Sequence, residues 1–115
     1  MKKALVTGSS GFIGSHLVSY LKKQGYWIRG VDIKEPEFRE LGGASSFGLL
    51  DLRIPSECHA AVYLLDTNFD EIYHLAADMG GMMFISNHQS QILHNNSLID
   101  LNMLDVARIY KVPKF

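Results

Sequence analysis

The segment from Thr7 to Gly14 restricts the fold of this chain more than any other feature. It reads Thr-Gly-Ser-Ser-Gly-Phe-Ile-Gly and follows the apolar run at the start of the chain. Gly8 permits a tight turn, Gly11 lets the backbone approach a pyrophosphate, and Gly14 allows a helix to pack closely on a strand. The free N–H groups and the positive end of such a helix attract phosphates. The segment therefore predicts a dinucleotide site, although glycines also mark ordinary turns.

An acidic residue farther along the chain supports this interpretation. Asp32 lies 18 residues beyond Gly14, at the end of a second apolar run. A carboxylate at that place can accept hydrogen bonds from the adenosine ribose hydroxyls and repel a 2′-phosphate. Lys34 could compensate a phosphate, but the glycine segment contains no arginine. We therefore predict NAD as the cofactor in preference to NADP; the alternative for Asp32 is a surface turn.

Short apolar runs alternate with longer amphipathic stretches along the whole chain. Strands are expected at Ala4–Thr7, Trp27–Ile33, Phe47–Leu50 and Asp70–Ala76, and helices at Phe12–Lys23, Pro55–Leu65 and Ser86–Tyr110. The first helix has one apolar face, formed by Phe12, Ile13, Leu17, Val18 and Leu21. Residues 35–46 form a loop with room for one helical turn. This pattern predicts an α/β fold with a Rossmann-type parallel sheet of strand order 3-2-1-4. It is the N-terminal half of a doubly wound fold, so residues 1–115 are expected to form a partial domain.

Composition excludes several classes of partner. A chain of 115 residues accommodates one small domain, and a formal net charge of −1 gives no electrostatic reason to bind nucleic acid or an anionic membrane. The apolar runs are too short for a secretion signal or a membrane span. The single cysteine, Cys58, cannot form an internal disulfide, which favours a cytoplasmic location. The five histidines lack metal-site spacing, so we expect no metal.

Taken together, these motifs resemble the extended short-chain dehydrogenase/reductase family of NAD-dependent epimerases and dehydratases, whose fingerprint is TGxxGxxG. Asp51-Leu52 resembles that family's adenine-contacting pair, and Leu75-Ala76-Ala77 its small-residue segment beside the cofactor. Asn96 matches an asparagine that braces the central sheet. The resemblance implies that the cofactor is contacted by Gly8, Ser10, Gly11, Phe12, Ile13, Gly14, Asp32, Asp51, Leu52, Leu75, Ala76, Ala77 and Asn96.

A narrower stretch, Ala76–Ile85, is similar to the GDP-mannose 3,5-epimerase group of that family. It reads AADMGGMMFI, with Met83 where glycine is expected. The resemblance implies that Gly80 and Gly81 lie beside a nucleotide sugar, because a side chain there would crowd the pyranose. The alternative is that the methionines of this stretch only fill a gap between a loop and the core.

The family's catalytic tyrosine–lysine pair, YxxxK, would follow Phe115, as would its serine or threonine and the epimerase cysteine. Tyr110–Lys114 satisfies YxxxK as a string, but Pro113 breaks the helix that the pair requires. Cys58 is expected in the core. No catalytic residue is therefore predicted, and the chain is expected to be the inactive NAD-binding part of a nucleotide-sugar enzyme. The alternatives are a stand-alone, catalytically silent module that binds a nucleotide or a partner, and a truncated product without function.

Two apolar surfaces predict a homodimer. The strand Asp70–Ala76 would expose one flank in the absence of a fifth strand, and exposed edges pair with other chains. The long C-terminal helix carries more apolar residues than one sheet face can cover, namely Ile92, Leu93, Leu98, Leu101, Leu104 and Ile109. In the family that the chain resembles, helices at this position build a four-helix dimer interface.

Overall fold

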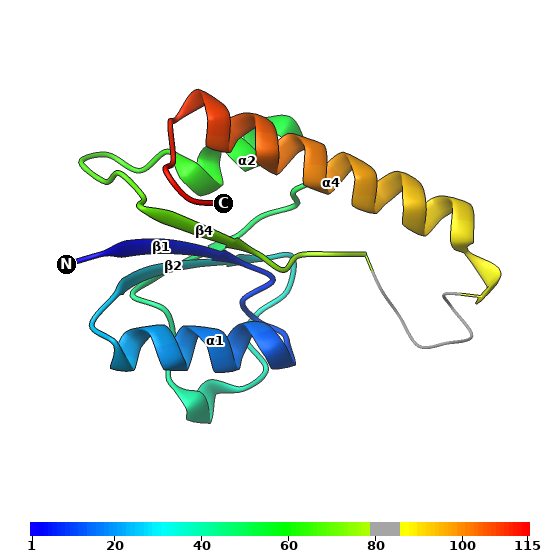
Figure 1. Cartoon of the computed structure of the whole chain (residues 1–115). Helices are drawn as coiled ribbons and strands as arrows, with labels where there is room; N and C mark the ends of the chain where they lie inside the picture. Colours follow the sequence, from blue (N-terminus) through cyan, green and yellow to red (C-terminus); the bar gives the residue numbers. More distant parts are fainter. Residues whose placement is uncertain (79–85) are drawn as a thin grey trace.

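The computed structural model describes residues 1–78 and 86–115. Its strands are β1 (Lys3–Thr7), β2 (Trp27–Asp32), β3 (Ser46–Leu49) and β4 (Glu71–His74), and they form a parallel sheet of order β3-β2-β1-β4. The helices are α1 (Phe12–Lys23), α2 (Pro55–Val62) and α4 (Gln89–Ile109), with a short 3₁₀ helix, η1, at Arg39–Leu41. α1 covers one face of the sheet, and α2 and α4 cover the other (Figure 1). The predicted fold class and strand order are confirmed.

β1 lies at the centre because it is apolar on both faces. Its residues Ala4–Thr7 have no exposed surface. Leu5 packs into the cluster below α2 and α4, whereas Ala4 and Val6 face α1. A strand buried on both faces reads as a continuous apolar run rather than an alternating one, as the sequence shows here.

α1 has the predicted bounds, and Leu17, Val18 and Leu21 of its predicted apolar face pack into the core, but the first two residues of that face do not. Val18 and Leu21 are buried, whereas the side chains of Phe12 and Ile13 are 65% and 70% exposed. The expectation that these two share the apolar face is wrong because Gly14 sets the side that approaches the sheet. That side also buries Ser15, and it places the first two residues of the helix outside the core.

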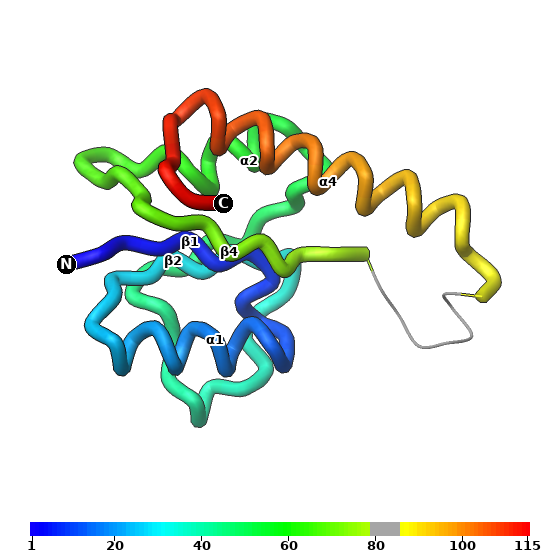
Figure 2. The backbone as a smooth tube through the Cα atoms, viewed as in Figure 1, coloured from blue at the N-terminus to red at the C-terminus, as the bar shows by residue number. Residues whose placement is uncertain are grey.

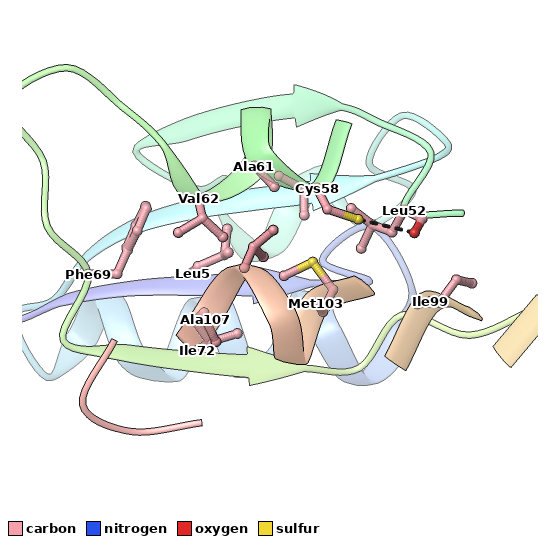
Figure 3. Close-up of a cluster of buried hydrophobic side chains, with 12 residues drawn as sticks. Leu5, Leu52, Cys58, Ala61, Val62, Phe69, Ile72, Ile99, Met103 and Ala107 are labelled. Atoms are coloured by element: carbon pink, nitrogen blue, oxygen red, sulfur yellow. Dashed lines mark hydrogen bonds between the residues drawn. The ribbon is translucent and has the colours of Figure 1, made fainter. Parts of the chain in front are cut away.

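The other layer is held by a cluster between α2, α4 and the sheet (Figure 3). Met103 of α4 and Cys58 and Ala61 of α2 are completely buried there, against Leu5 of β1. α2 ends at Val62 instead of continuing to Leu65, because residues 64–67 form a turn in which Asp66 has a φ of 61°. No helix in the two described stretches of the chain is long and apolar enough to cross a membrane.

The outer flank of β4 is partly covered, which differs from the bare flank expected. After α4 the chain turns back toward β4 (Figure 2). Lys114 pairs with Glu71 in a parallel bridge, and its carbonyl accepts the Ile72 N–H at 2.8 Å. The sequence pattern missed this contact because it joins residues more than 40 positions apart, which the turn after α4, where Lys111 has a φ of 54°, brings together.

The buried thiol of Cys58 gives a first testable expectation. Its side chain is inaccessible, and Sγ donates to the Leu52 carbonyl at 3.1 Å (Figure 3). Burial raises the pKa of this thiol to about 11, so it remains protonated at pH 8. A thiol-specific reagent at pH 8 should leave the folded chain unmodified and label it in full after addition of urea. Rapid labelling of the folded chain would contradict this burial.

Candidate dinucleotide site

A cleft of about 530 Å³ opens at the carboxyl ends of the strands. In parallel α/β sheets this is the edge at which ligands bind. The loops after β1, β2, β3 and β4 all contribute to it. Its lining includes Gly8, Gly11, Asp32, Lys34, Leu50, Asp51, Leu52, Arg53, Leu75, Ala76, Ala77, Asp78 and Ile99.

The three glycines of the first loop differ in how much space the fold leaves for a side chain. Gly8 has a φ of 69°, and a Cβ there would lie 2.9 Å from the backbone nitrogen of Ala76. A Cβ on Gly14 would lie 2.0 Å from the carbonyl oxygen of Gly8. Gly11 is different, because a Cβ there would meet only the Gly8 carbonyl oxygen, at an ordinary 3.7 Å. The fold itself therefore requires glycine at positions 8 and 14 but not at position 11.

Asp32 connects the end of β2 to the glycine loop. One carboxylate oxygen accepts the Ser10 N–H at 3.0 Å, and the other accepts the N–H groups of Ile33 and Lys34 at 2.7 and 3.3 Å. Lys34 itself forms an ion pair with Glu37, which raises the pKa of the lysine. The carboxylate is therefore fixed at the cleft by backbone donors, and the ammonium of Lys34 is paired with Glu37.

The loop after β3 contains an ion pair that the sequence analysis did not assign. The Arg53 guanidinium donates to both carboxylate oxygens of Asp51, with Nη2–Oδ2 at 2.7 Å and Nε–Oδ1 at 2.9 Å. This bidentate geometry is the strong form of an arginine–carboxylate contact. Asn102 of α4 donates to the carbonyl of Leu52 at 3.1 Å and so ties the same loop to the helix layer. The Arg53 guanidinium holds the pKa of Asp51 below its ordinary value.

Substitution of Arg53 by glutamine should raise the titration midpoint of the Asp51 carboxyl toward its ordinary value. A carboxyl whose pKa is lowered by folding stabilises the folded state in full above its unfolded pKa, and this stabilisation is lost as the pH falls through its folded pKa. The substitution should therefore lower the stability of the folded chain at neutral pH. The difference in stability from wild type should disappear as the pH falls through the lowered pKa of Asp51. Carboxyl carbon NMR during an acid titration measures the midpoint. Arg108→Gln, which removes the exposed partner of Asp105, is the matched control. An unchanged Asp51 midpoint in Arg53→Gln would refute this assignment.

The segment after β4 is tied to α4 by amide side chains. Asn96 accepts the Asp78 N–H at 2.5 Å and donates to the Asp78 carbonyl at 3.2 Å. The buried Asn95 donates to the Asp78 carboxylate at 2.8 Å. These contacts tie Asp78, just after β4, to α4. Gly80 and Gly81, the predicted sugar-binding residues, lie outside the described residues.

The remaining predicted residues do not line the cleft. Ser10 is buried behind it and donates its hydroxyl to the carbonyl of Lys34 at 2.8 Å. Phe12 and Ile13 lie on the exposed side of the first turn of α1 and are not among the lining residues. The hydroxyl of Tyr110 contacts His59, whereas the ammonium of Lys114 pairs with Glu71. The two ends of the YxxxK string therefore have separate partners.

A comparison with known protein families identifies the family to which this chain belongs. The sequence model of the NAD dependent epimerase/dehydratase family matches residues 4–115. The chain belongs to the NAD-dependent epimerase/dehydratase family.

Individual relatives agree with this family assignment but are longer. The epimerase-family chain is 44% identical over 112 residues to GDP-mannose 3,5-epimerase 1 of Oryza sativa subsp. japonica, and 38% identical over 114 residues to GDP-mannose 3,5-epimerase of Arabidopsis thaliana. These matches cover 96% and 98% of this chain but only 28% and 29% of the relatives. The solved UDP-glucose 4-epimerase of Thermus thermophilus in complex with NAD superposes with a TM-score of 0.81 at 29% identity, over 96% of this chain and 35% of that one. The chain therefore spans about a third or less of these relatives.

Proposed function

We propose that this chain is the NAD(H)-binding part of a nucleotide-sugar epimerase or dehydratase. The observation that carries the proposal is the Asp32 carboxylate, which backbone donors hold at the cleft beside the glycine loop. A carboxylate in that position suits the hydroxyls of an adenosine ribose and opposes a 2′-phosphate. The solved Thermus relative in complex with NAD supports the same cofactor.

The glycine loop fits the pyrophosphate of such a cofactor. Gly11 lines the cleft, and the fold leaves its Cβ position free. A glycine that the protein does not need for its own packing leaves that space to a ligand. The pyrophosphate would approach this position and the N–H groups at the start of α1, while Asp51 and Leu52 would hold the adenine.

Calorimetry on the 115-residue chain tests the proposal. NAD should bind weakly but measurably, and more tightly than NADP. Equal affinity for the two dinucleotides would remove the role proposed for Asp32. If neither nucleotide released or absorbed heat, the proposed cofactor site would be wrong for this chain.

The whole enzyme would oxidise a sugar hydroxyl by hydride transfer to NAD and later return the hydride. This chain alone would bind the cofactor. It would not turn over a nucleotide sugar, because Tyr110 contacts His59 and Lys114 pairs with Glu71, so the two do not form a catalytic pair. Incubation with NAD and GDP-mannose should leave the sugar unchanged by NMR. Turnover that Tyr110→Phe abolishes would contradict this.

A homodimer across α4 extends the proposal. Leu93, Leu101 and Leu104 are 70%, 64% and 51% exposed on this helix. Leu101 and Leu104, together with Val112 and Phe115, line a shallow hollow at its C-terminal half. An apolar surface of this kind is typical of an interface between chains. Because the single cysteine of this sequence forms no internal disulfide, we also propose a reducing, cytoplasmic location.

The double substitution of Leu101 and Leu104 by lysine should convert the dimer into a monomer, because it places two charges within the apolar contact. Light scattering at micromolar concentration measures the mass. Leu65→Lys, at a position that is 79% exposed in the turn after α2, is the control and should leave the dimer intact. A wild-type mass of 12.9 kDa would rule out the dimer.

A further inference from the structure

We propose that His74 is a positioning residue for the cleft, acting through Thr7 and in one fixed tautomer. In this arrangement its Nδ1 is unprotonated and accepts a hydrogen bond from the Thr7 hydroxyl, while its Nε2–H donates to Asp100. The peptide units that it positions are those of Leu75 and Ala76, which line the cleft. The consequence for nucleotide affinity rests on the proposed function, whereas the tautomer does not.

The first step of the argument is the hydrogen-bond inventory of the Thr7 hydroxyl. This side chain has no exposed surface, so water does not reach it. Its Oγ1 accepts the Leu75 N–H at 3.0 Å and the Ala76 N–H at 3.1 Å. A hydroxyl has two acceptor sites and one proton, so both acceptor sites are used. The proton is left for the third neighbour, Nδ1 of His74 at 2.8 Å.

The second step follows for the imidazole. Because Nδ1 accepts a hydrogen bond from the Thr7 hydroxyl, it carries no proton of its own, and the ring proton lies on Nε2. That nitrogen is 2.8 Å from the Oδ1 atom of Asp100 on α4. A carboxylate at one ring nitrogen and a donor at the other fix a single neutral tautomer. An imidazolium would direct Nδ1–H at an oxygen whose acceptor sites are both occupied.

The groups around the ring are few and come from three elements. Thr7 lies on β1, directly opposite His74 in the sheet register, and Asp100 faces the ring from α4. The Phe115 ring lies with its centroid 5.8 Å away. The imidazole side chain is 11% exposed. Asp100 is the only ionisable group that contacts the ring within the described parts of the chain.

The third step connects this network to the cleft. Gly8 follows Thr7, and a Cβ on Gly8 would lie 2.9 Å from the carbonyl carbon of Leu75 and the nitrogen of Ala76. The glycine turn thus contacts the same peptide units that the Thr7 hydroxyl holds. If these units shift, the spacing between the glycine turn and the opposite wall of the cleft shifts with them. Through its contacts with Thr7 and with Asp100 of α4, His74 thereby helps to set the width of the cleft.

Nitrogen NMR on the labelled full chain without nucleotide tests the tautomer directly. His74 should show a pyridine-like Nδ1 and a protonated Nε2 at neutral pH. A protonated Nδ1, in either the other tautomer or the imidazolium, would overturn the proposal. This result does not depend on whether the chain binds NAD.

Paired substitutions test the positioning role. His74→Asn places an acceptor near the position of Nδ1, so it should retain the Thr7 contact. His74→Gln places its amide near the position of Nε2, so it should lose that contact while still reaching Asp100. We expect the Ala76 amide to exchange about tenfold faster in His74→Gln than in His74→Asn, and NAD to bind about tenfold more weakly.

Substitutions of Thr7 test the same hydrogen bond by changing its other partner. Thr7→Val removes the hydroxyl at constant shape and should accelerate exchange at Ala76, whereas Thr7→Ser should restore protection. Equal exchange in His74→Asn and His74→Gln, with unchanged protection in Thr7→Val, would refute the positioning role. If wild type binds no NAD, the proposed function fails, and the exchange data still decide this inference.

Discussion

Substitution of Gly14 by alanine is expected to disrupt the start of α1 and to abolish nucleotide binding. The added Cβ would lie 2.0 Å from the Gly8 carbonyl oxygen, 2.8 Å from the Gly8 carbonyl carbon and 2.9 Å from the Ser9 Cα. All three are backbone atoms, so no side chain can move aside. Overpacking of this kind costs about 3 kcal/mol or more, a large share of the roughly 5–15 kcal/mol that holds a small domain folded.

Urea unfolding followed by circular dichroism measures this effect. Gly43→Ala is the matched control, because a Cβ there meets nothing within 4 Å, and it should leave the unfolding midpoint nearly unchanged. Gly14→Ala should lower the midpoint strongly. If the two variants unfolded at the same urea concentration, the close packing of helix and strand at Gly14 would be refuted.

Asp32→Asn should reduce NAD affinity by about 10- to 100-fold and narrow the preference over NADP. The native carboxylate accepts three backbone N–H groups with two oxygens, whereas an amide offers only one oxygen. Loss of a hydrogen bond to a charged group costs about 1.5–3 kcal/mol, which corresponds to that range of affinity. Removal of the negative charge also lessens the repulsion of a 2′-phosphate.

Calorimetric titration of both dinucleotides measures the affinity and the preference together. Glu35→Gln is the control, since this exposed glutamate pairs with Arg39 and is not among the cleft-lining residues. It should bind both nucleotides as wild type does. An Asp32→Asn variant with an unchanged NAD-to-NADP ratio would remove Asp32 from cofactor selection.

The sequence predicts the architecture well because its strongest signals are local. The glycine segment, the apolar run before it and Asp32 together indicate the strand order and the edge where the cleft lies, and the structure confirms that arrangement. Apolar spacing predicted the packed residues Val18 and Leu21 of α1 but not the exposure of Phe12 and Ile13. Gly14 decides the buried face, and glycine adds nothing to an apolar pattern.

The contacts that the sequence did not reveal join residues far apart in the chain. His74 and Thr7 are separated by 67 residues, and only the register of two parallel strands places them together. Lys114 meets Glu71 only after the turn at the end of α4. The Asp51–Arg53 ion pair, by contrast, could have been predicted from the sequence. An arginine two residues beyond an acidic residue in a loop is a local signal for such a pair.

The placement of β1 has a consequence for the kinetics of folding. This central strand pairs with β4 through contacts such as Thr7–His74, whose residues lie 67 positions apart in the sequence. Long-range parallel pairing slows folding because the entropy of loop closure is lost before the contacts form. A nascent chain therefore carries a largely apolar strand with one open side until β4 has been synthesised. During that interval this apolar strand is available to chaperones and to neighbouring chains.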